Sequence, residues 1–257
     1  MSVGRSPPRT PKPPPPLSVE AVVNGFAVVA GDRPWRTPAG ADLVVPTRAL
    51  AEALADEIAA ARVAGKAWRP RMDALGLTRL AATAIDRIGP ASVATCGALL
   101  GFAATDLVCY RDSGASALRT RQEAAWQPLL DWLAESFDAR LIVVEGVIPE
   151  PQPQAALDAL SAALDRCDPF TLAGLGLAVQ TAGSLAIGLA LAHGHLDAAQ
   201  ASALADLDEA FQNEQWGADA EALAKRRLRA DDMALAERFL KLLNAPAARP
   251  SITRSQS

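Results

Sequence analysis

The feature that most constrains the fold of this chain is a run of 23 residues without a charged side chain, from Phe170 to Ala192. A helix of that length can cross a bilayer. However, the run contains Gln180 and four glycines, much of its apolarity is alanine, and flanking aromatic and basic anchors are missing. We therefore favour one central helix buried on all sides, whose small residues let neighbouring helices approach closely: Gly183, Ser184 and Gly188.

The composition indicates a protein with a sizeable core. The chain has 257 residues, half of them hydrophobic, which suits one large or two modest domains. A net charge of -4 and a pI near 5.3 argue against nucleic acid as the main partner. The three cysteines have no C-x-x-C spacing, which suits buried free thiols in a reducing compartment. We expect no stable membrane insertion and a cytoplasmic protein.

The order of patterns predicts an α+β fold with two domains. Residues 1–18 are proline-rich and predict a disordered tail. Residues 19–148 predict an α+β N-terminal domain, a small antiparallel sheet plus helices, and residues 149–245 an all-helical C-terminal domain. Residues 246–257 predict a second disordered tail.

Short strands open the first domain. Two β-branched runs flank an Asn24-Gly25 turn signal, and residues 43–46 and 139–146 predict further strands. A helix follows Thr47, which can cap its free amides, and an apolar stripe on that helix faces the sheet: Leu50, Leu54 and Ile58. Gly65 would end it.

Helical periodicity governs most of the remaining chain. It predicts helices over residues 75–88, 99–110, 119–137 and 154–167. Within 119–137, Pro128 is tolerable only in a first turn or at a kink. After the linker at 149–153 we expect only helices.

The segment DLDEAFQNEQWG, residues 206–217, is the best candidate for a binding surface. Asp197 and Gln200 form a capping box that starts its helix, and Gly217 ends it. Apolar residues fall on one side, namely Leu204, Leu207 and Phe211, and mostly polar residues on the opposite side, namely Glu209, Gln212, Asn213 and Trp216. A solvated helix face with Trp216 as a packing residue explains the pattern as well as a partner surface does.

Motifs for chemistry are weak. The chain has no phosphate-binding glycine loop, no G-x-S-x-G and no H-E-x-x-H. His193 and His195 invite a metal or acid–base site, but histidines are also favoured beside the last carbonyls of a helix, and no third ligand has a recognisable spacing. A small hydrolase that uses a metal or carboxylates remains the alternative function.

Several segments in order resemble the ATP synthase assembly chaperones of the ATP-twelve family. They are RTP at 36–38, PTRALAEALADEI at 46–58, LTRLAATAID at 77–86, ATDLVCYR at 104–111, WQPLLDWL at 126–133, GSLAIGLAL at 183–191 and DEAFQNEQWG at 208–217. The resemblance covers about residues 20–243. Ile58 and Gln127 depart from the family's usual tryptophan and aspartate.

The resemblance implies function as well as fold. It implies an assembly chaperone without catalysis, cofactor or metal, which binds the free alpha subunit of the F-type ATP synthase head before it meets beta. It also implies a cytoplasmic bacterial or mitochondrial matrix location, and a monomer is expected. The family's acidic motif falls on residues we expect to bind the partner: Asp208, Glu209, Gln212, Glu214 and Trp216. The matched segment at 104–111 contains Asp106, Tyr110 and Arg111. A structural role, holding the domains together, is the simpler explanation for these residues.

Overall fold

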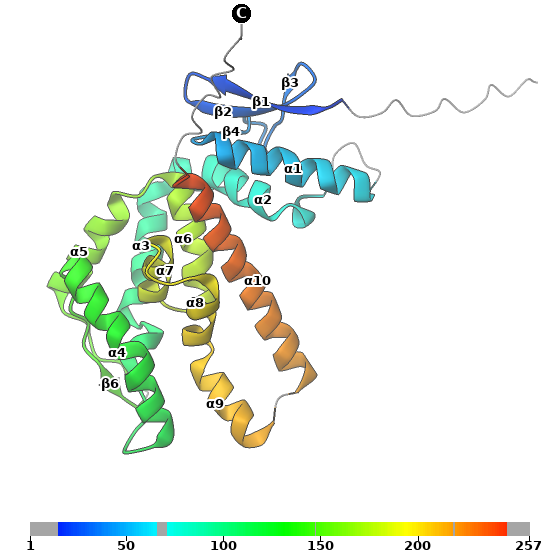
Figure 1. Ribbon diagram of the computed structural model, residues 1–257. Coiled ribbons are helices and arrows are strands. Elements are labelled where there is room, and N and C mark those ends of the chain that lie inside the picture. The colour runs from blue at the N-terminus through cyan, green and yellow to red at the C-terminus, as the bar shows by residue number, and fades with distance from the viewer. Residues whose placement is uncertain (1–14, 66–70, 147, 218, 246–257) are drawn as a thin grey trace, which may run out of the picture.

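The computed structural model describes residues 15–65, 71–146, 148–217 and 219–245. Its strands are β1 (Leu17–Val22), β2 (Gly25–Ala30), β3 (Arg33–Pro34), β4 (Val44–Val45), β5 (Tyr110–Arg111) and β6 (Val144–Glu145). Its helices are α1 (Arg48–Gly65), α2 (Gly76–Thr83), α3 (Ser92–Ala104), α4 (Ala117–Phe137), α5 (Gln154–Asp165), α6 (Pro169–Ala182), α7 (Leu185–Ala192), α8 (Ala198–Ala205), α9 (Leu207–Trp216) and α10 (Ala220–Leu243). The α+β class is confirmed: a small antiparallel sheet with α1 against it stands at one end, and a helical body follows (Figure 1).

The sheet is built around β2. It pairs antiparallel with β1, β3 and β4, and the predicted turn at Asn24-Gly25 joins β1 to β2. Gly25 has φ +139°, and a Cβ there would lie 2.3 Å from the Val45 carbonyl oxygen, so only glycine fits. Leu17 and Ser18, which the sequence places in the tail, instead begin β1. Most of the two predicted tails lies outside the described residues.

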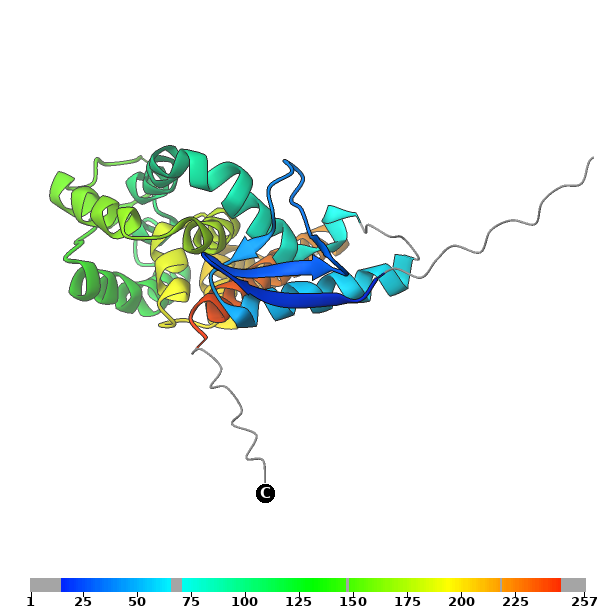
Figure 2. The ribbon, with the colours of Figure 1, turned by 90° about the horizontal axis from the view of Figure 1, so that it is seen from above.

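Helix α1 covers the sheet as predicted, and the view from above shows the strands lying over it (Figure 2). Leu50, Leu54 and Ile58 are fully buried. Thr47 accepts a hydrogen bond from the Leu50 amide at 3.2 Å, and its hydroxyl donates to the Leu242 carbonyl at 2.8 Å. The cap of α1 therefore also attaches the end of α10.

Two carboxylates connect α1 and the sheet to the next helix. Glu57 accepts the amides of Leu77 and Thr78, both at 2.8 Å, and so satisfies free donors in the first turn of α2. Asp86, in the turn that follows α2, accepts a hydrogen bond at 2.7 Å from the hydroxyl of Thr37, which lies in the loop after β3. These bonds fix α2 between the sheet and the helical body.

The helical region from α2 to α3 is a succession of short segments. A π-helical turn, Ala84–Ile88, and a 3₁₀ turn, Gly89–Ala91, separate the two helices. By length and composition alone, Gly76–Cys109 is the one helical segment among the described residues that could cross a membrane; an 18-residue window within it has a mean hydropathy of 1.6, and a third of that window is buried.

The uncharged run is not one helix, so that prediction was wrong. It forms α6 and α7, which pack against each other. Gly183 ends α6 with φ +68°, and Ser184 caps α7 by accepting the Ile187 amide at 3.0 Å. The buried Asp106 carboxylate accepts the Ala186 amide at 3.1 Å, and its burial raises its pKa. Gly183 and Ser184 therefore make the break; close helix approach is not their role.

Close approach does occur at Gly188 and at Gly174. A Cβ on Gly188 would lie 2.4 Å from Val179 on α6, and one on Gly174 would lie 2.8 Å from Leu240 on α10. Since α6 also contacts α2, α3 and α8, it stands at the centre of the helical body. Residues 185–191 of α7 are all buried, whereas α6 leaves Gln180 exposed, so the expectation of a helix buried on all sides fits α7 better than α6.

One expectation is narrowed and one needs correction. Pro128 lies in the interior of α4, well past its first turn, so of the two predicted positions only the kink is left as a prediction. The residue is exposed, so the carbonyl that it leaves without an amide can face water. The strand expected over 139–146 shrinks to β6, which pairs in parallel with β5. The amide and carbonyl of Ile142 bond instead to the Gln152 side chain at 2.8 and 3.1 Å, which replaces a strand partner.

The division of domains at residue 148 stays a prediction. Helices α3 and α4 precede that point, yet they pack against α5, α6 and α7, which follow it. Figure 1 shows the sheet with α1 and α2 at one end and α3 to α10 in the other part.

We expect Gly188→Ala to lower the free energy of unfolding by about 1–3 kcal/mol, because the new methyl group meets both the side chain and the backbone of Val179. The control is Gly97→Ala on α3, where an added Cβ meets no atom within 4 Å and the helix should gain about 0.5–1 kcal/mol. Urea unfolding measures both. Equal effects of the two substitutions would contradict tight α6–α7 packing.

Candidate partner-binding surface

The acidic segment lies on a helix that stands away from the body. Helix α9 has no buried residue and ends at Trp216, with Gly217 as its cap. The first half of α10, the next helix, is exposed. We call α9 and residues 220–231 of α10 the arm. In Figure 1 the arm projects at the end of the molecule opposite the sheet. Leu207 packs against the core but is only half-buried, so polar contacts contribute much of what positions α9.

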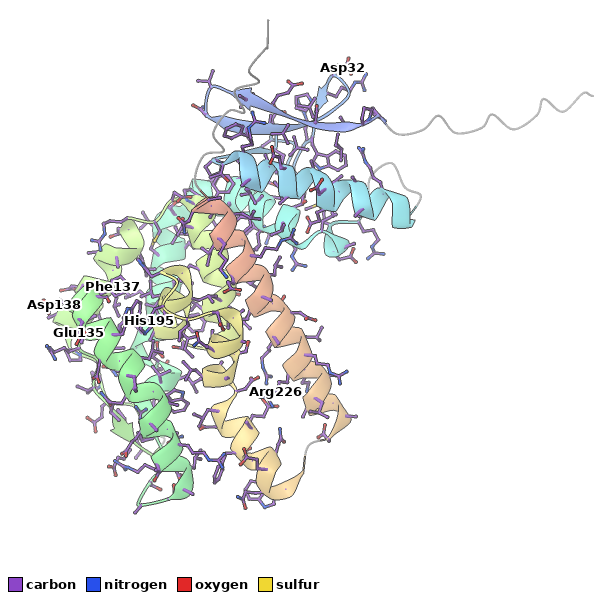
Figure 3. All side chains as sticks on the ribbon, viewed as in Figure 1. Asp32, Glu135, Phe137, Asp138, His195 and Arg226 are labelled. Carbon is purple, nitrogen blue, oxygen red and sulfur yellow. The ribbon has the colours of Figure 1, made fainter. Side chains whose placement is uncertain are left out.

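The helix expected to begin at the capping box and run to Gly217 is interrupted. The capping box of Asp197 and Gln200 is present, but α8 ends at Ala205 and α9 begins after Asp206. The side chain of Asp206, only 4% exposed, forms ion pairs with Arg226 at 3.1 Å and Arg229 at 2.8 Å on α10. Figure 3 shows Arg226 extending from α10 between the two helices. This buried carboxylate fixes the base of the arm.

All three of the predicted partner-binding carboxylates already have partners within the chain. Glu209 pairs with Arg229 on α10. Asp208 accepts from the Gln122 side chain on α4 at 2.9 Å, and Glu214 pairs with Arg121 on α4 at 2.7 Å. The acidic motif thus holds α9 between α4 and α10. A Glu209→Lys change would place two cations together, so it would disturb the arm as well as any partner contact.

Gln212 and Trp216 are exposed, as a partner surface requires. Trp216 is 80% exposed at the last position of α9. Phe211 on the other side is half-buried beneath the Arg121 guanidinium, 5.1 Å from its ring centre. The predicted separation of an inward Phe211 from an outward Trp216 therefore holds in α9.

The sequence indicated the basic residues of α10 but not their partners. Arg226 and Arg229 are three apart and so share one helix face, which was the available signal. Nothing in the spacing shows that this face meets Asp206, a residue that sequence reasoning missed as the anchor.

The two histidines pack in an aromatic cluster. His195 stacks on Trp132 with ring centres 4.6 Å apart, and His193 meets the edge of Phe137 at 5.2 Å. Burial, and next Arg166, lower the pKa of His193. In the part of the chain that the structure describes, no three metal-binding side chains of His, Cys, Asp or Glu gather.

Comparison with known proteins identifies the family. The sequence model of the family described as ATP12 chaperone protein matches residues 17–134 of this chain. The structure of Atp12 from Paracoccus denitrificans superposes with a TM-score of 0.81 at 38% identity, and the match covers 88% of this chain and 95% of that one. The chain belongs to the ATP12 chaperone family.

Two further solved structures of this fold are similar. A mutant form of P. denitrificans Atp12p gives the same TM-score, identity and coverage. The Atu1473 protein of Agrobacterium tumefaciens gives a TM-score of 0.79 at 39% identity, over 88% of this chain and 84% of that one. Membership of the ATP12 family makes the protein a chaperone of ATP synthase assembly.

The positions that depart from the family pattern have structural roles here. Ile58 is fully buried beneath the sheet, and Gln127 donates to Asp131 one turn further along α4 at 2.8 Å. Neither residue belongs to the arm.

We expect Asp206→Asn to lower the free energy of unfolding by about 1–3 kcal/mol, since it weakens two charge-assisted bonds to a nearly buried group. The control is Glu221→Gln on α10. Glu221 forms an exposed ion pair with Lys225 one turn along that helix, so this substitution should change the free energy of unfolding by no more than about 0.5 kcal/mol. Thermal unfolding compares the two proteins. A midpoint unchanged in Asp206→Asn would rule out the anchor role.

Proposed function

We propose that this chaperone binds the free alpha subunit of the F-type ATP synthase head through the arm, and prevents its aggregation before it pairs with beta. It acts as a monomer without catalysis, nucleotide or cofactor, in a bacterial cytoplasm or, in a eukaryote, in the mitochondrial matrix. Occupying the partner's surface by mass action is sufficient for this activity.

The observation that carries the proposal is the exposed apolar surface of the arm. Trp216, Leu228 and Leu223 are 80%, 65% and 42% exposed, and all three belong to α9 or the first half of α10. Tryptophan is among the residues most often found at binding hot spots. An alpha subunit without beta exposes an apolar interface, which such a surface would cover.

The polar contacts of the arm support the same role. Asp206, Arg229 and Glu214 fix α9 by ion pairs, while its outward side chains remain free of apolar packing. A preordered surface loses less conformational entropy on binding than a loose one.

We expect Trp216→Ala to reduce capture of the alpha subunit about tenfold or more, because it removes the largest exposed side chain of the arm. The unfolding midpoint should not change, since the residue has little packing. Tagged chaperone is mixed with separately expressed alpha and beta subunits, and the bound fraction is measured. Val93→Ala, which shortens an 85% exposed side chain on α3, is the control. Capture of beta instead of alpha, or equal losses in both variants, would refute the proposal.

Exchanging the charges of Arg121 and Glu214 distinguishes two roles for Glu214: direct contact with the alpha subunit, or positioning of α9 through its ion pair with α4. Arg121 and Glu214 are both about half exposed, so Glu214→Arg should cost no more than about 1 kcal/mol of stability. If Glu214 contacts the alpha subunit, Glu214→Arg lowers capture, and the double change with Arg121→Glu does not restore it. Restored capture in the double variant would show that Glu214 acts only through α4.

A further inference from the structure

The outer edge of the four-stranded sheet is a second place where the chain can bind another polypeptide. Strand β2 pairs with β1, β3 and β4, and β1 pairs with β2 alone. All six residues of β1 pair with β2 in a continuous register. The strand therefore presents an uninterrupted edge on its other side.

The register shows which backbone groups of β1 point away from the sheet. In an antiparallel pair, residues alternate between those that bond to the partner strand and those that bond away from it. The Gly31 amide donates to the Pro16 carbonyl at 3.1 Å, so the even-numbered residues of β1 bond to β2. The amides and carbonyls of Leu17, Val19 and Ala21 point to the free side, and they have no hydrogen-bond partner among the described residues.

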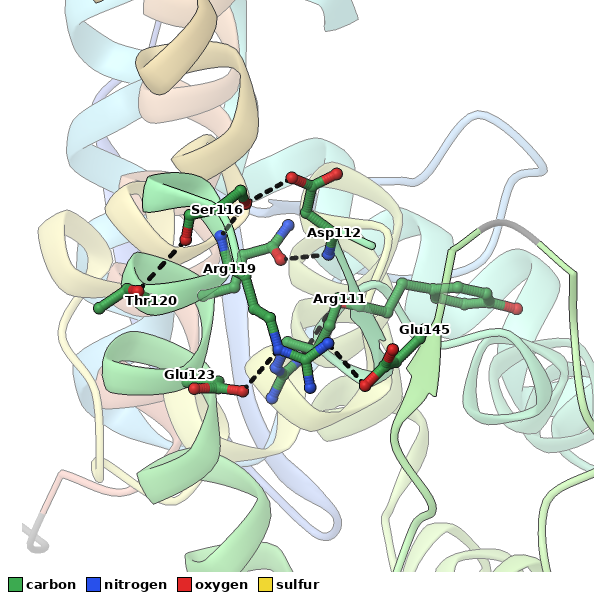
Figure 4. A network of polar contacts seen from close by, with 9 residues as sticks. Arg111, Asp112, Ser116, Arg119, Thr120, Glu123 and Glu145 are labelled. Carbon is green, nitrogen blue, oxygen red and sulfur yellow. Dashed lines mark hydrogen bonds and ion pairs between the residues drawn. The ribbon is translucent and has the colours of Figure 1, made fainter. Parts of the chain in front are cut away.

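The second sheet shows how the chain covers a strand end elsewhere. The Gln122 side chain accepts the Asp112 amide at 2.7 Å, directly after β5. Arg119 of α4 pairs with Glu145 of β6 at 2.6 Å, which attaches α4 to that sheet (Figure 4). Within the described residues, β1 has no such cover on its free side.

The edge also lacks the features that usually prevent pairing with another chain. Natural edge strands are often protected by proline, by lysine or by a bulge. Leu17–Val22 contains none of these, and its one charged residue is Glu20. Beside the hairpin turn, Val22 and Val23 are 42% and 101% exposed, so apolar surface adjoins the edge. An open edge of this kind binds an extended segment through main-chain hydrogen bonds.

The side chains of β1 define the kind of segment that fits. Leu17 and Val19 face the core but are only half-buried, so an apolar side chain on an added strand would cover them. Glu20 lies on the opposite face, where it is exposed and has no ion pair with any described residue. A basic side chain beside it would therefore be favourable. The fitting segment alternates apolar side chains with a lysine or arginine.

A second copy of this chain fits less well than such a segment. Antiparallel pairing of two β1 strands requires outward-bonding residues to face each other, so in the two registers of greatest overlap Val19 faces either Val19 or Ala21 of the second copy. The first register places the two Glu20 side chains diagonally, about 7–8 Å apart, and the second places them directly opposite at about 5 Å. Like charges in these positions are destabilising.

We propose that the free edge of β1 binds an extended segment of the partner subunit as an added strand, in which apolar side chains facing α1 alternate with a lysine or arginine near Glu20. The inference rests on the proposed function for the identity of the partner. It adds a contact at the end of the molecule opposite the arm (Figure 1).

The first test compares two substitutions at Ala21 in capture of the alpha subunit. Ala21→Pro removes an outward amide and places a ring on the edge, while the bonds from β1 to β2 remain. The unfolding midpoint should change little, and capture should fall about tenfold. Ala21→Val keeps the amide, so it is the control and should capture normally. Unchanged capture by folded Ala21→Pro overturns the inference.

Charge reversal at Glu20 tests the same edge without altering the backbone. Glu20→Lys should lower capture about fivefold, because it turns an attraction into a repulsion. The control is Glu135→Lys, which changes the net charge equally at an exposed position on α4, away from the sheet (Figure 3). Equal losses in the two variants would mean that total charge governs capture, and would count against the edge.

Hydrogen exchange separates failure of this inference from failure of the proposed function. In the free chaperone, the Val19 and Ala21 amides should exchange fast by NMR, whereas those of Ser18 and Glu20 exchange slowly because they bond to β2. Separately expressed alpha and beta subunits are then added. Slower exchange at Val19 and Ala21 in the complex with alpha is the expected result.

Each other outcome has a definite meaning. A complex with alpha in which the Val19 and Ala21 amides still exchange fast overturns the edge inference and leaves the proposed function standing. Slower exchange with beta alone supports the edge and refutes the choice of alpha. Binding of neither subunit refutes both proposals.

Discussion

The close packing of α6 against its neighbours is the constraint on which the rest of the structure depends. Gly188 lets α7 approach Val179, and Gly174 admits Leu240 of α10. Larger side chains at these positions would separate the helices and open voids, because protein interiors tolerate little change in volume. Since α10 also carries half of the arm, this packing determines the direction in which the arm projects.

The arm uses a different kind of stabilisation. Its helix α9 contributes no buried side chain, and charged contacts through Asp206, Arg229 and Glu214 hold it to α10 and α4. Core packing would have required apolar residues to face inward along the whole helix. Polar attachment instead leaves Trp216 and the outward surface available, which suits a protein that holds another subunit for a time.

Much of the fold could be predicted because local signals decide it. The Asn24-Gly25 turn and the stripe of Leu50, Leu54 and Ile58 have one good interpretation each, and the structure confirms both. The break in the uncharged run was harder. Gly183 followed by Ser184 is a helix stop followed by a helix cap, but small residues also suit close helix contact, and composition alone does not separate the two.

The candidate surface was predictable only in part, because its contacts join residues that are far apart in the sequence. Helical spacing placed Trp216 outward, yet it gives no information about partners that lie far away in sequence. Asp208 meets Gln122 across 86 residues, and Asp206 meets two arginines of a later helix. Such pairs depend on how the helices pack, so the sequence showed charges without showing which of them are already neutralised.

Helix α10 belongs to both ends of the molecule. Its 24 residues correspond to roughly 36 Å, and its last turn accepts the Thr47 hydroxyl at the start of α1. The sheet and the arm are therefore attached to a single rod. A load placed on the arm has a direct mechanical route to the first turn of α1, so the two extremities of the chaperone need not respond independently.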